Sequence, residues 1–179
     1  MYRTSLAVIG KMGAGKTEVT DLFVSHGYTK GILSHPLKIA AREIWGGTMK
    51  MDREKGIALG KFIQRADPEA LVRAWQRRSQ DHPSPFIVEA PRYPSDYDGL
   101  SQLGFRFVEV LADPVTRVDR LQRAGHGRLT DVSQLDDETE TALDDRRLFP
   151  VEHTIFNNGD LSKLADFVAA VVRKEDARV

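Results

Sequence analysis

The stretch AVIGKMGAGKTEVTDLF, residues 7–23, decides the fold. A short apolar run meets a glycine-rich turn, and a helix-like pattern follows after a lysine and a threonine. The spacing Gly10-x-x-x-x-Gly15-Lys16-Thr17 is that of a P-loop, whose backbone N–H groups surround the phosphates of a nucleotide. The motif lies between a strand-like run and a helical pattern, which is the context it requires. The sequence therefore predicts a phosphate-binding loop.

The residues of this loop have separate tasks in binding ATP. Glycines allow successive N–H groups to turn inward, and the start of the following helix adds the positive end of its dipole. Lys16 is expected to reach the β- and γ-phosphates, and the Thr17 hydroxyl is expected to bind Mg²⁺. We therefore predict ATP and Mg²⁺ as cofactors, held by Gly10, Lys11, Met12, Gly13, Ala14, Gly15, Lys16 and Thr17.

The composition limits the partners that this chain can have. Its 179 residues fit one domain, and 26 basic residues balance 26 acidic ones, so no general attraction to nucleic acid is expected. The absence of cysteine excludes disulfides and thiolate metal sites, and it fits a reducing compartment. No apolar run approaches the roughly 18 residues that a membrane helix needs. We expect a cytoplasmic protein, monomeric or homodimeric, that binds no membrane and does not bind nucleic acid stably.

Apolar runs and helical patterns alternate along the chain. We predict strands at 4–9, 28–33, 85–90, 105–112 and 153–157, and helices at 16–26, 36–45, 52–65, 67–80, 95–104, 113–125, 136–148 and, after a turn at 157–160, up to residue 174. This alternation predicts an α/β fold with helices on both faces of a five-stranded parallel sheet. We therefore expect a single P-loop domain, 1–179. Its core would be 1–35 and 82–179, with an inserted helical substrate lobe at 36–81 and a lid at 123–137.

Three classes of P-loop protein compete for this sequence. A GTPase would carry Asn-Lys-x-Asp, but the only similar place, NNGD at 157–160, lacks the lysine. A motor or DNA-remodelling ATPase would usually carry an apolar run that ends in Asp or Asp-Glu, whereas the third strand ends IVEAPR. A small-molecule kinase needs two binding lobes and several mobile arginines, because phosphoryl transfer is mostly positioning and charge neutralisation. The sequence favours the kinase.

Arginines of the kind that a kinase lid needs follow the fourth strand. They recur every third residue on the predicted helix and continue into the polar loop 126–134: Arg117, Arg120, Arg123 and Arg128. Val118 and Leu121 are expected to form the opposite, buried face of that helix. A closing lid suits a kinase because bulk water would otherwise accept the phosphate. The alternative is a solvated basic face that pairs with Asp113 and Asp119.

In the order and spacing of its motifs, the sequence resembles the phage-type deoxynucleoside monophosphate kinases, within the P-loop nucleoside monophosphate kinases. The resemblance covers nearly the whole chain. Beside the P-loop it rests on SHPLK at 34–38, QRADPEALVRAW at 64–75, IVEAPRYPSD at 87–96 and HTIFNNGDLSKL at 153–164. It implies transfer of the γ-phosphate of ATP to a deoxynucleoside 5′-monophosphate, giving the diphosphate and ADP. A bacteriophage-encoded enzyme of this kind would work in the host cytoplasm.

The resemblance also gives roles to residues outside the P-loop. The catalytic residues would be Lys16, Arg120, Arg123 and Arg128. The acceptor would be bound by Lys38, Arg65, Trp75, Glu89, Arg92 and Tyr93. Arg65 and Arg92 suit its phosphate, since a guanidinium fork matches two phosphate oxygens. The turn at Asn158 would pass near the adenine, or be an ordinary turn capped by Asp160. Four aromatic residues are candidates to pack against the base: Trp45, Phe62, Trp75 and Tyr93. Two of the four are expected to belong to the hydrophobic core instead.

One departure from the family and one rival family keep alternatives open. The family usually places Asp where this chain has Ala90, and the adjacent Glu89 would replace it only if its side chain faces the site, since neighbours on a strand point to opposite faces. Dephospho-CoA kinases share the P-loop, the arginine lid and a similar IFNNGDL ending, but their third strand usually continues Pro-Leu-Leu-aliphatic-Glu. Here Pro91 precedes Arg92 and Tyr93. A dephospho-CoA kinase, and a P-loop ATPase with a nucleic-acid-associated or regulatory role, are the alternatives.

Overall fold

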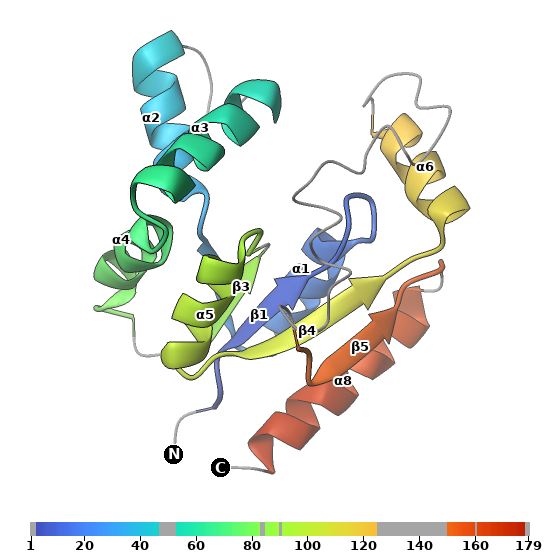
Figure 1. The fold of residues 1–179 in the computed structure, drawn as a ribbon. Helices are drawn as coiled ribbons and strands as arrows, with labels where there is room; N and C mark the ends of the chain where they lie inside the picture. The colour runs from blue at the N-terminus through green and yellow to red at the C-terminus, as the bar shows by residue number, and fades with distance from the viewer. Residues whose placement is uncertain are drawn as a thin grey trace.

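The fold is that of a computed structural model, which describes residues 3–46, 53–82, 85–89, 91–124, 150–159 and 161–177. Its centre is a five-stranded sheet in the order β2 (Thr29–Ile32), β3 (Phe86–Glu89), β1 (Leu6–Ile9), β4 (Arg106–Leu111) and β5 (His153–Phe156). All neighbouring strands are parallel. The predicted α/β fold is therefore confirmed, and the carboxyl ends of the strands share one edge (Figure 1).

Helices cover both faces of this sheet. The described helices are α1 (Lys16–Ser25), α2 (His35–Trp45), α3 (Arg53–Ala66), α4 (Ala70–Ser79), α5 (Pro94–Gln102), α6 (Pro114–Arg123) and α8 (Leu161–Asp176). α1 and α8 pack on one face, and α4 and α5 cover the other (Figure 1). Each corresponds to a predicted helix, with ends shifted by a few residues. The helix predicted at 136–148 lies outside the described residues.

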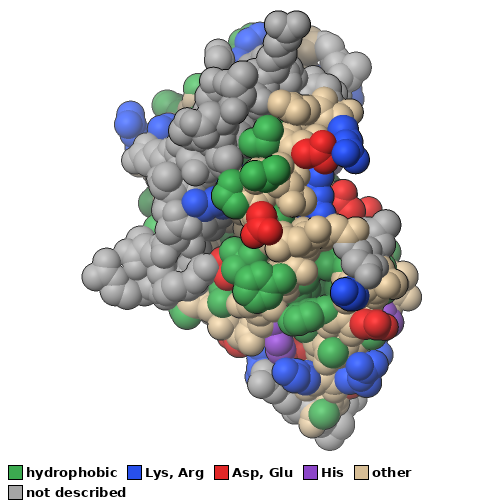
Figure 2. Space-filling view, turned by 90° about the vertical axis from the view of Figure 1, so that its right-hand side faces the viewer, with side chains coloured by type: hydrophobic (Ala, Val, Ile, Leu, Met, Phe, Trp, Pro, Cys, Tyr) green, Lys and Arg blue, Asp and Glu red, His purple; other side chains and the backbone are tan. Residues whose placement is uncertain are grey.

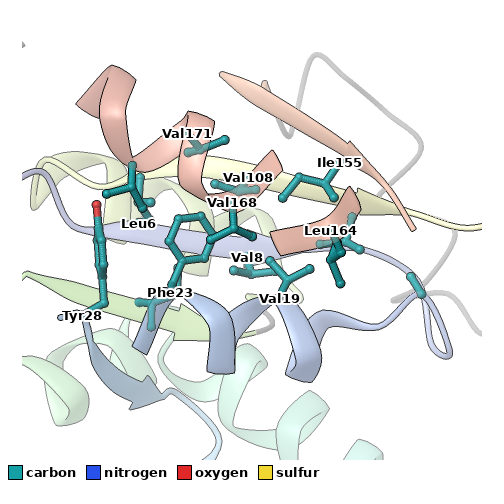
Figure 3. Packing of buried hydrophobic residues seen from close by; sticks show 14 residues of the cluster. Leu6, Val8, Val19, Phe23, Tyr28, Val108, Ile155, Leu164, Val168 and Val171 are labelled. Carbon is teal, nitrogen blue, oxygen red and sulfur yellow. The ribbon is translucent and has the colours of Figure 1, made fainter. Parts of the chain in front are cut away.

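The first strand is apolar throughout because both of its faces are covered. Every residue of β1 is at most 1 % exposed. Leu6 and Val8 belong to one buried cluster with Phe23 of α1 and Val168 of α8, and Figure 3 shows these side chains converging between the sheet and the two helices. The alternate residues of β1 face the other helical layer. This double burial gives the P-loop, which follows β1, a rigid base.

The last helix is held to the sheet by a buried carboxylate, which contacts side chains at the starts of two strands. Glu175 of α8 is fully buried. One of its carboxylate oxygens lies 2.8 Å from Nε2 of His153, and the other lies 3.4 Å from Nη1 of Arg106. The two partners begin β5 and β4, so this cluster holds the end of α8 at the amino edge of the sheet, away from the P-loop.

The segment between β2 and β3 divides into two parts. α2 and α3 contact each other and stand beyond the ends of the strands (Figure 1). α4 packs on the sheet instead, with Val72 and Trp75 in the same buried cluster as Val88 of β3. The lobe predicted at 36–81 thus includes one helix whose buried face belongs to the core of the sheet. The lid predicted at 123–137 lies almost wholly outside the described residues.

Candidate active site

The P-loop follows β1, between the carboxyl ends of β3 and β4. Gly10, Gly13 and Gly15 have φ values of 148°, 79° and 93°, which residues with a side chain rarely adopt. Space adds a second requirement. A Cβ at Gly10 would overlap the carbonyl oxygen of Val110, and a Cβ at Gly15 would overlap the side-chain amide of Asn157. The loop is therefore shaped by β4 and by the end of β5 as well as by its own glycines.

Lys16 opens α1 and turns back over the loop. Its ammonium donates to the carbonyl oxygens of Gly10 at 2.7 Å and Lys11 at 3.1 Å. The positive charge thus lies against the loop predicted to hold phosphates, next to the positive end of the helix dipole. An ammonium held by neutral carbonyls can exchange them for phosphate oxygens, since hydrogen bonds between charged groups are the stronger ones.

Thr17 and Glu89 form the part of the site that suits a cation. The Thr17 hydroxyl donates to Oε1 of Glu89 at 2.8 Å. The side chain of Glu89 faces α1 because it lies two residues after Ile87, which packs in the α1 cluster. A hydroxyl and a carboxylate are oxygen donors of the kind that Mg²⁺ prefers, so this pair fits the ion. The structure thus brings Glu89, which was expected among the acceptor residues, into contact with the P-loop.

Asn157 and Arg120 contact backbone carbonyl oxygens of the P-loop and support its conformation. Asn157, only 4 % exposed, donates its side-chain amide to the carbonyl oxygen of Ala14 at 3.0 Å. Its own oxygen accepts from Nη2 of Arg120 at 3.1 Å. Nη1 of Arg120 lies 3.4 Å from the carbonyl oxygens of Gly13 and Ala14. Arg120, predicted as a catalytic lid residue, contacts the P-loop and Asn157 in this structure and stabilises the loop.

Arg117 was expected on the basic face of its helix but is buried. Its side chain is 4 % exposed, and its Nε donates to the carbonyl oxygen of Met12 at 2.8 Å. It shares the buried face of α6 with Leu121, one turn later, whereas Val118 is only half-buried. A small pocket behind the P-loop is lined by Gly10, Lys11, Ala14, Glu109, Val110, Leu111, Ala112 and Arg117. The helical spacing from Leu121 was the signal that could have placed Arg117 inward.

Of the two remaining lid arginines, the structure describes only Arg123. It is 79 % exposed and pairs with Asp119 at 3.0 Å, one turn before it on α6. This is the solvated arrangement that the sequence left open for this residue. Arg128 lies outside the described residues. Sequence reasoning thus named Arg120 and Arg123 together, but of these two the structure places only Arg120 against the P-loop.

Arg92 follows β3 at the carboxyl edge, and its backbone is held by a buried carboxylate. Oδ2 of Asp96 accepts from the backbone N–H groups of Arg92 at 3.0 Å and Tyr93 at 3.2 Å, which caps α5. Burial raises the pKa of Asp96, and these two hydrogen bonds oppose that rise. The Arg92 side chain is exposed. The main chain is therefore fixed while the guanidinium stays accessible to a ligand.

Arg65 and Arg92 belong to segments that touch each other. Gln64 of α3 both donates to and accepts from the Ser95 hydroxyl, at 2.8 and 3.0 Å. Arg65 adjoins this contact on one side and Arg92 precedes it on the other, and both side chains are exposed. Lys38 of α2 is half-buried. The structure thus brings the segments of the two arginines together.

The aromatic candidates separate into core and surface. Trp75 is buried, with its ring edge-on to Phe86 at 5.2 Å between centroids, so it belongs to the core and is not available to a base. Trp45 and Phe62 are 47 % and 68 % exposed. Tyr93 is half-buried, with its hydroxyl near Gly60 of α3. Helix aromatics of this kind usually pack in cores because their large apolar area is costly to expose.

Asn158, predicted beside the adenine, is exposed and accepts from the backbone N–H of Asp113 at 2.8 Å. It ties the start of α6 to the turn after β5. Its neighbour Asn157, which the sequence interpretation passed over, is the residue that reaches the P-loop. The signal was available: His153 and Ile155 are buried, and Asn157 continues the same alternation inward.

Charged side chains of both signs share the face of the molecule seen in Figure 2. On the face seen in Figure 2, the described part carries Lys and Arg side chains beside Asp and Glu side chains. Among the described residues, no group of three or more His, Cys, Asp and Glu could hold a metal ion. No helix in the described ranges is long and apolar enough to cross a membrane.

Solved structures share this fold, and some of them are named as kinases. TT1252 from Thermus thermophilus aligns over 97 % of this chain and 98 % of its own, with a TM-score of 0.59 and 21 % identity. A gluconokinase from Sinorhizobium meliloti aligns over 98 % of this chain and 95 % of its own, with a TM-score of 0.59 and 18 % identity. A shikimate kinase from Acinetobacter baumannii aligns over 98 % of this chain and 94 % of its own, with a TM-score of 0.56 and 16 % identity.

These likenesses establish the fold. No family model and no curated protein sequence matches the chain. At such low identities the sheet, the helical layers and the position of the loop are shared, whereas the acceptor is a matter for the individual site. The chain therefore has the P-loop kinase fold.

Proposed function

We propose that this protein is an ATP-dependent phosphotransferase whose acceptor is a deoxynucleoside 5′-monophosphate. The observation that carries the phosphotransferase is the contact of the Thr17 hydroxyl with Glu89 beside the Lys16 ammonium. Oxygen donors suited to a cation and an ammonium suited to phosphate thus lie at the carboxyl edge of a parallel sheet, where ligands of such folds bind, and this supports the proposal. The similar fold of kinases that act on other small molecules supports this class of reaction.

On the donor side, the P-loop amides and Lys16 would bind the phosphates of ATP. Thr17 would bind Mg²⁺, with Glu89 holding its hydroxyl in place and adding negative charge, and the ion neutralises the charge that develops between the β- and γ-phosphates. Lys16 would leave the carbonyl oxygens of Gly10 and Lys11 for phosphate oxygens. Asn157 and Arg120 keep the loop in one conformation, so that little ordering remains to be done when the nucleotide binds.

On the acceptor side, Arg92 and Arg65 would hold the monophosphate. An oxygen of that phosphate attacks the γ-phosphorus, a new P–O bond forms, and the bond from the γ-phosphorus to the β–γ bridging oxygen breaks to release ADP. The acceptor oxygen is already anionic, so no strong general base is needed. Two exposed guanidinium groups on touching segments are a reason to favour a phosphorylated acceptor, since each can bind phosphate oxygens in pairs.

A coupled ADP-release assay tests this proposal. The panel is deoxynucleoside monophosphates, ribonucleoside monophosphates, dephospho-CoA, shikimate and gluconate, each with ATP and Mg²⁺. We expect ADP release with at least one deoxynucleoside monophosphate and none without acceptor. Release only with dephospho-CoA, shikimate or gluconate would replace the acceptor but keep the phosphotransferase, whereas equal release with no acceptor at all would make the protein an ATPase.

A further inference from the structure

Four side chains form a chain of contacts that begins and ends on α1. Thr17 donates to Oε1 of Glu89, and Nζ of Lys30 lies 3.6 Å from Oε2 of the same carboxylate. The Lys30 ammonium also donates to Asp21 at 2.9 Å. Thr17 and Asp21 are one turn apart on the helix, and therefore on the same side of it. The contacts link α1, β3 and β2 in a closed ring beside the P-loop.

The sheet register explains why this ring can form. Lys30 pairs with Ile87, and Ile32 pairs with Glu89. Ile87 packs in the cluster beneath α1, and residues two apart on a strand share a face. Lys30 and Glu89 therefore both point at α1. The side chains of Lys30 and Glu89 are only 30 % and 21 % exposed, which limits their freedom compared with an ordinary surface ion pair.

The Lys30 amine is a charged group at neutral pH. Burial lowers its pKa, but the hydrogen bond that it donates to Asp21 and the negative charges of Glu89 and Asp21 outweigh that effect and raise the pKa overall. The ammonium therefore stands between two carboxylates, and it restrains the Glu89 oxygen that Thr17 does not use.

We propose that Lys30 is a positioning residue for the cation half of the P-loop, because it fixes the Glu89 carboxylate that orients the Thr17 hydroxyl. A hydroxyl has one proton to donate and two lone pairs. When the Thr17 hydroxyl donates that proton in its hydrogen bond to Glu89, the lone pairs of Thr17 are left to face a cation. A carboxylate restrained at both oxygens has one orientation, so Lys30 sets this geometry without touching the nucleotide. The inference rests on the proposed binding of ATP and Mg²⁺ at this loop.

Positioning and simple charge predict opposite results. An ammonium near a cation site repels the cation, so loss of Lys30 would strengthen cation binding if its charge acted alone. If Lys30 works by restraining Glu89, its loss should weaken cation binding. The effect should then also disappear when Glu89 itself is removed, because two residues that act through one contact are not additive.

The experiment measures Mn²⁺ binding to the protein–ADP complex by electron paramagnetic resonance of the free ion. The variants are Lys30→Met, Lys30→Arg, Asp21→Asn, Glu89→Ala and the double variant Lys30→Met/Glu89→Ala. Lys174→Met, an exposed lysine of α8, is the matched control. Circular dichroism and thermal melting check the fold of each, and metal-free ADP affinity is titrated separately.

We expect Lys30→Met to weaken Mn²⁺ binding about fivefold, or about 1 kcal/mol at 1.4 kcal/mol per tenfold, with metal-free ADP affinity unchanged. Lys30→Arg should keep most of the affinity, Asp21→Asn should give a smaller loss, and Lys174→Met none. In the Glu89→Ala background, Lys30→Met should add less than about twofold.

Unchanged or tighter Mn²⁺ binding in Lys30→Met would overturn the positioning role, and so would the same fivefold loss in the Glu89→Ala background. If Lys30→Met does not fold, the exposed Asp21→Asn decides the matter, and wild-type Mn²⁺ affinity in that variant overturns the role. A wild-type protein that binds no Mn²⁺ with ADP would instead overturn the proposed function, and the inference with it.

Discussion

Truncation of Asn157 to alanine tests whether the P-loop is held from behind. The change removes the hydrogen bond to the Ala14 carbonyl and the one from Arg120. A neutral hydrogen bond contributes about 0.5–1.5 kcal/mol and one with a charged partner about 1.5–3 kcal/mol. Arg120 is half-buried and can regain water, so the low end applies, and we expect a loss of about 2–3 kcal/mol. For a chain of this length that corresponds to a fall in Tm of about 4–12 °C.

The same change should weaken nucleotide binding, because a looser loop must be ordered by the ligand. We expect ADP affinity to fall about fivefold, which corresponds to about 1 kcal/mol. Urea unfolding gives the stability, with an unchanged m value as the check on two-state behaviour, and calorimetric titration gives the affinity.

Asn158→Ala is the matched control, since it alters the adjacent, exposed asparagine, for which the structure gives a single hydrogen bond, to Asp113. It should cost about 1 kcal/mol or less. The reasoning fails if Asn157→Ala melts within about 1 °C of wild type and binds ADP normally. It also fails if Asn158→Ala costs as much stability as Asn157→Ala, because burial against the loop would then carry no weight.

Three further changes address the reaction and the core. Lys16→Ala should abolish transfer in a folded protein, because charge growing between the β- and γ-phosphates is left bare; unchanged turnover with a normal circular dichroism spectrum would remove the P-loop assignment. Arg92→Ala should lower kcat/KM for the deoxynucleoside monophosphate about 10- to 100-fold, from charge-assisted hydrogen bonds of about 1.5–3 kcal/mol, and Arg92→Lys should recover only part; weaker ATP binding instead would place the arginine on the donor side. Burial chiefly raises the pKa of Tyr28 to about 12. The folded protein then keeps a proton that the unfolded chain loses near pH 10, so stability should fall as pH rises from 10 through 12. Tyr28→Phe should remove that fall without a loss at pH 7, since the hydroxyl is buried without a partner among the described residues; urea unfolding at pH 7 and 11 measures both, and an unchanged fall in the variant would contradict the assignment.

The fold was predictable because its signals are local. The P-loop glycines are dictated by their backbone angles, and continuous apolar strands alternate with helical patterns. The strand order was not predicted, because the rule that such connections keep one hand leaves several orders open. The side of the sheet reached by Glu89 was harder. Its alternation with Ile87 could be read from the sequence, but only the packing of α1 on that face shows that the carboxylate meets Thr17.

Side-chain roles at the site were less predictable, since several were assigned from the family pattern and not from periodicity. Asn158 was chosen for the turn, although the alternation of β5 points to Asn157. The basic face of α6 was treated as uniform, although Arg117 stands one turn from the buried Leu121. A buried arginine is unusual because its charge must be paired or hydrogen-bonded. The residue type alone therefore argues against the buried position that the structure shows for Arg117.

The two halves of the site differ in what holds them, and this difference bears on the acceptor. The proposed donor half is built from the P-loop, β3 and β5, whose residues are hydrogen-bonded to one another, with Asn157 buried, Glu89 half-buried and Thr17 exposed. The proposed acceptor half uses the exposed Arg65 of α3, a helix that stands beyond the sheet, and the exposed Arg92 after β3. A substitution in that exposed half disturbs little of the core, so we expect changes of acceptor to arise there. If the proposed assignment holds, the acceptor is selected by the few side chains around Arg92, and kcat/KM measured across acceptors for variants there tests this more directly than any comparison of folds.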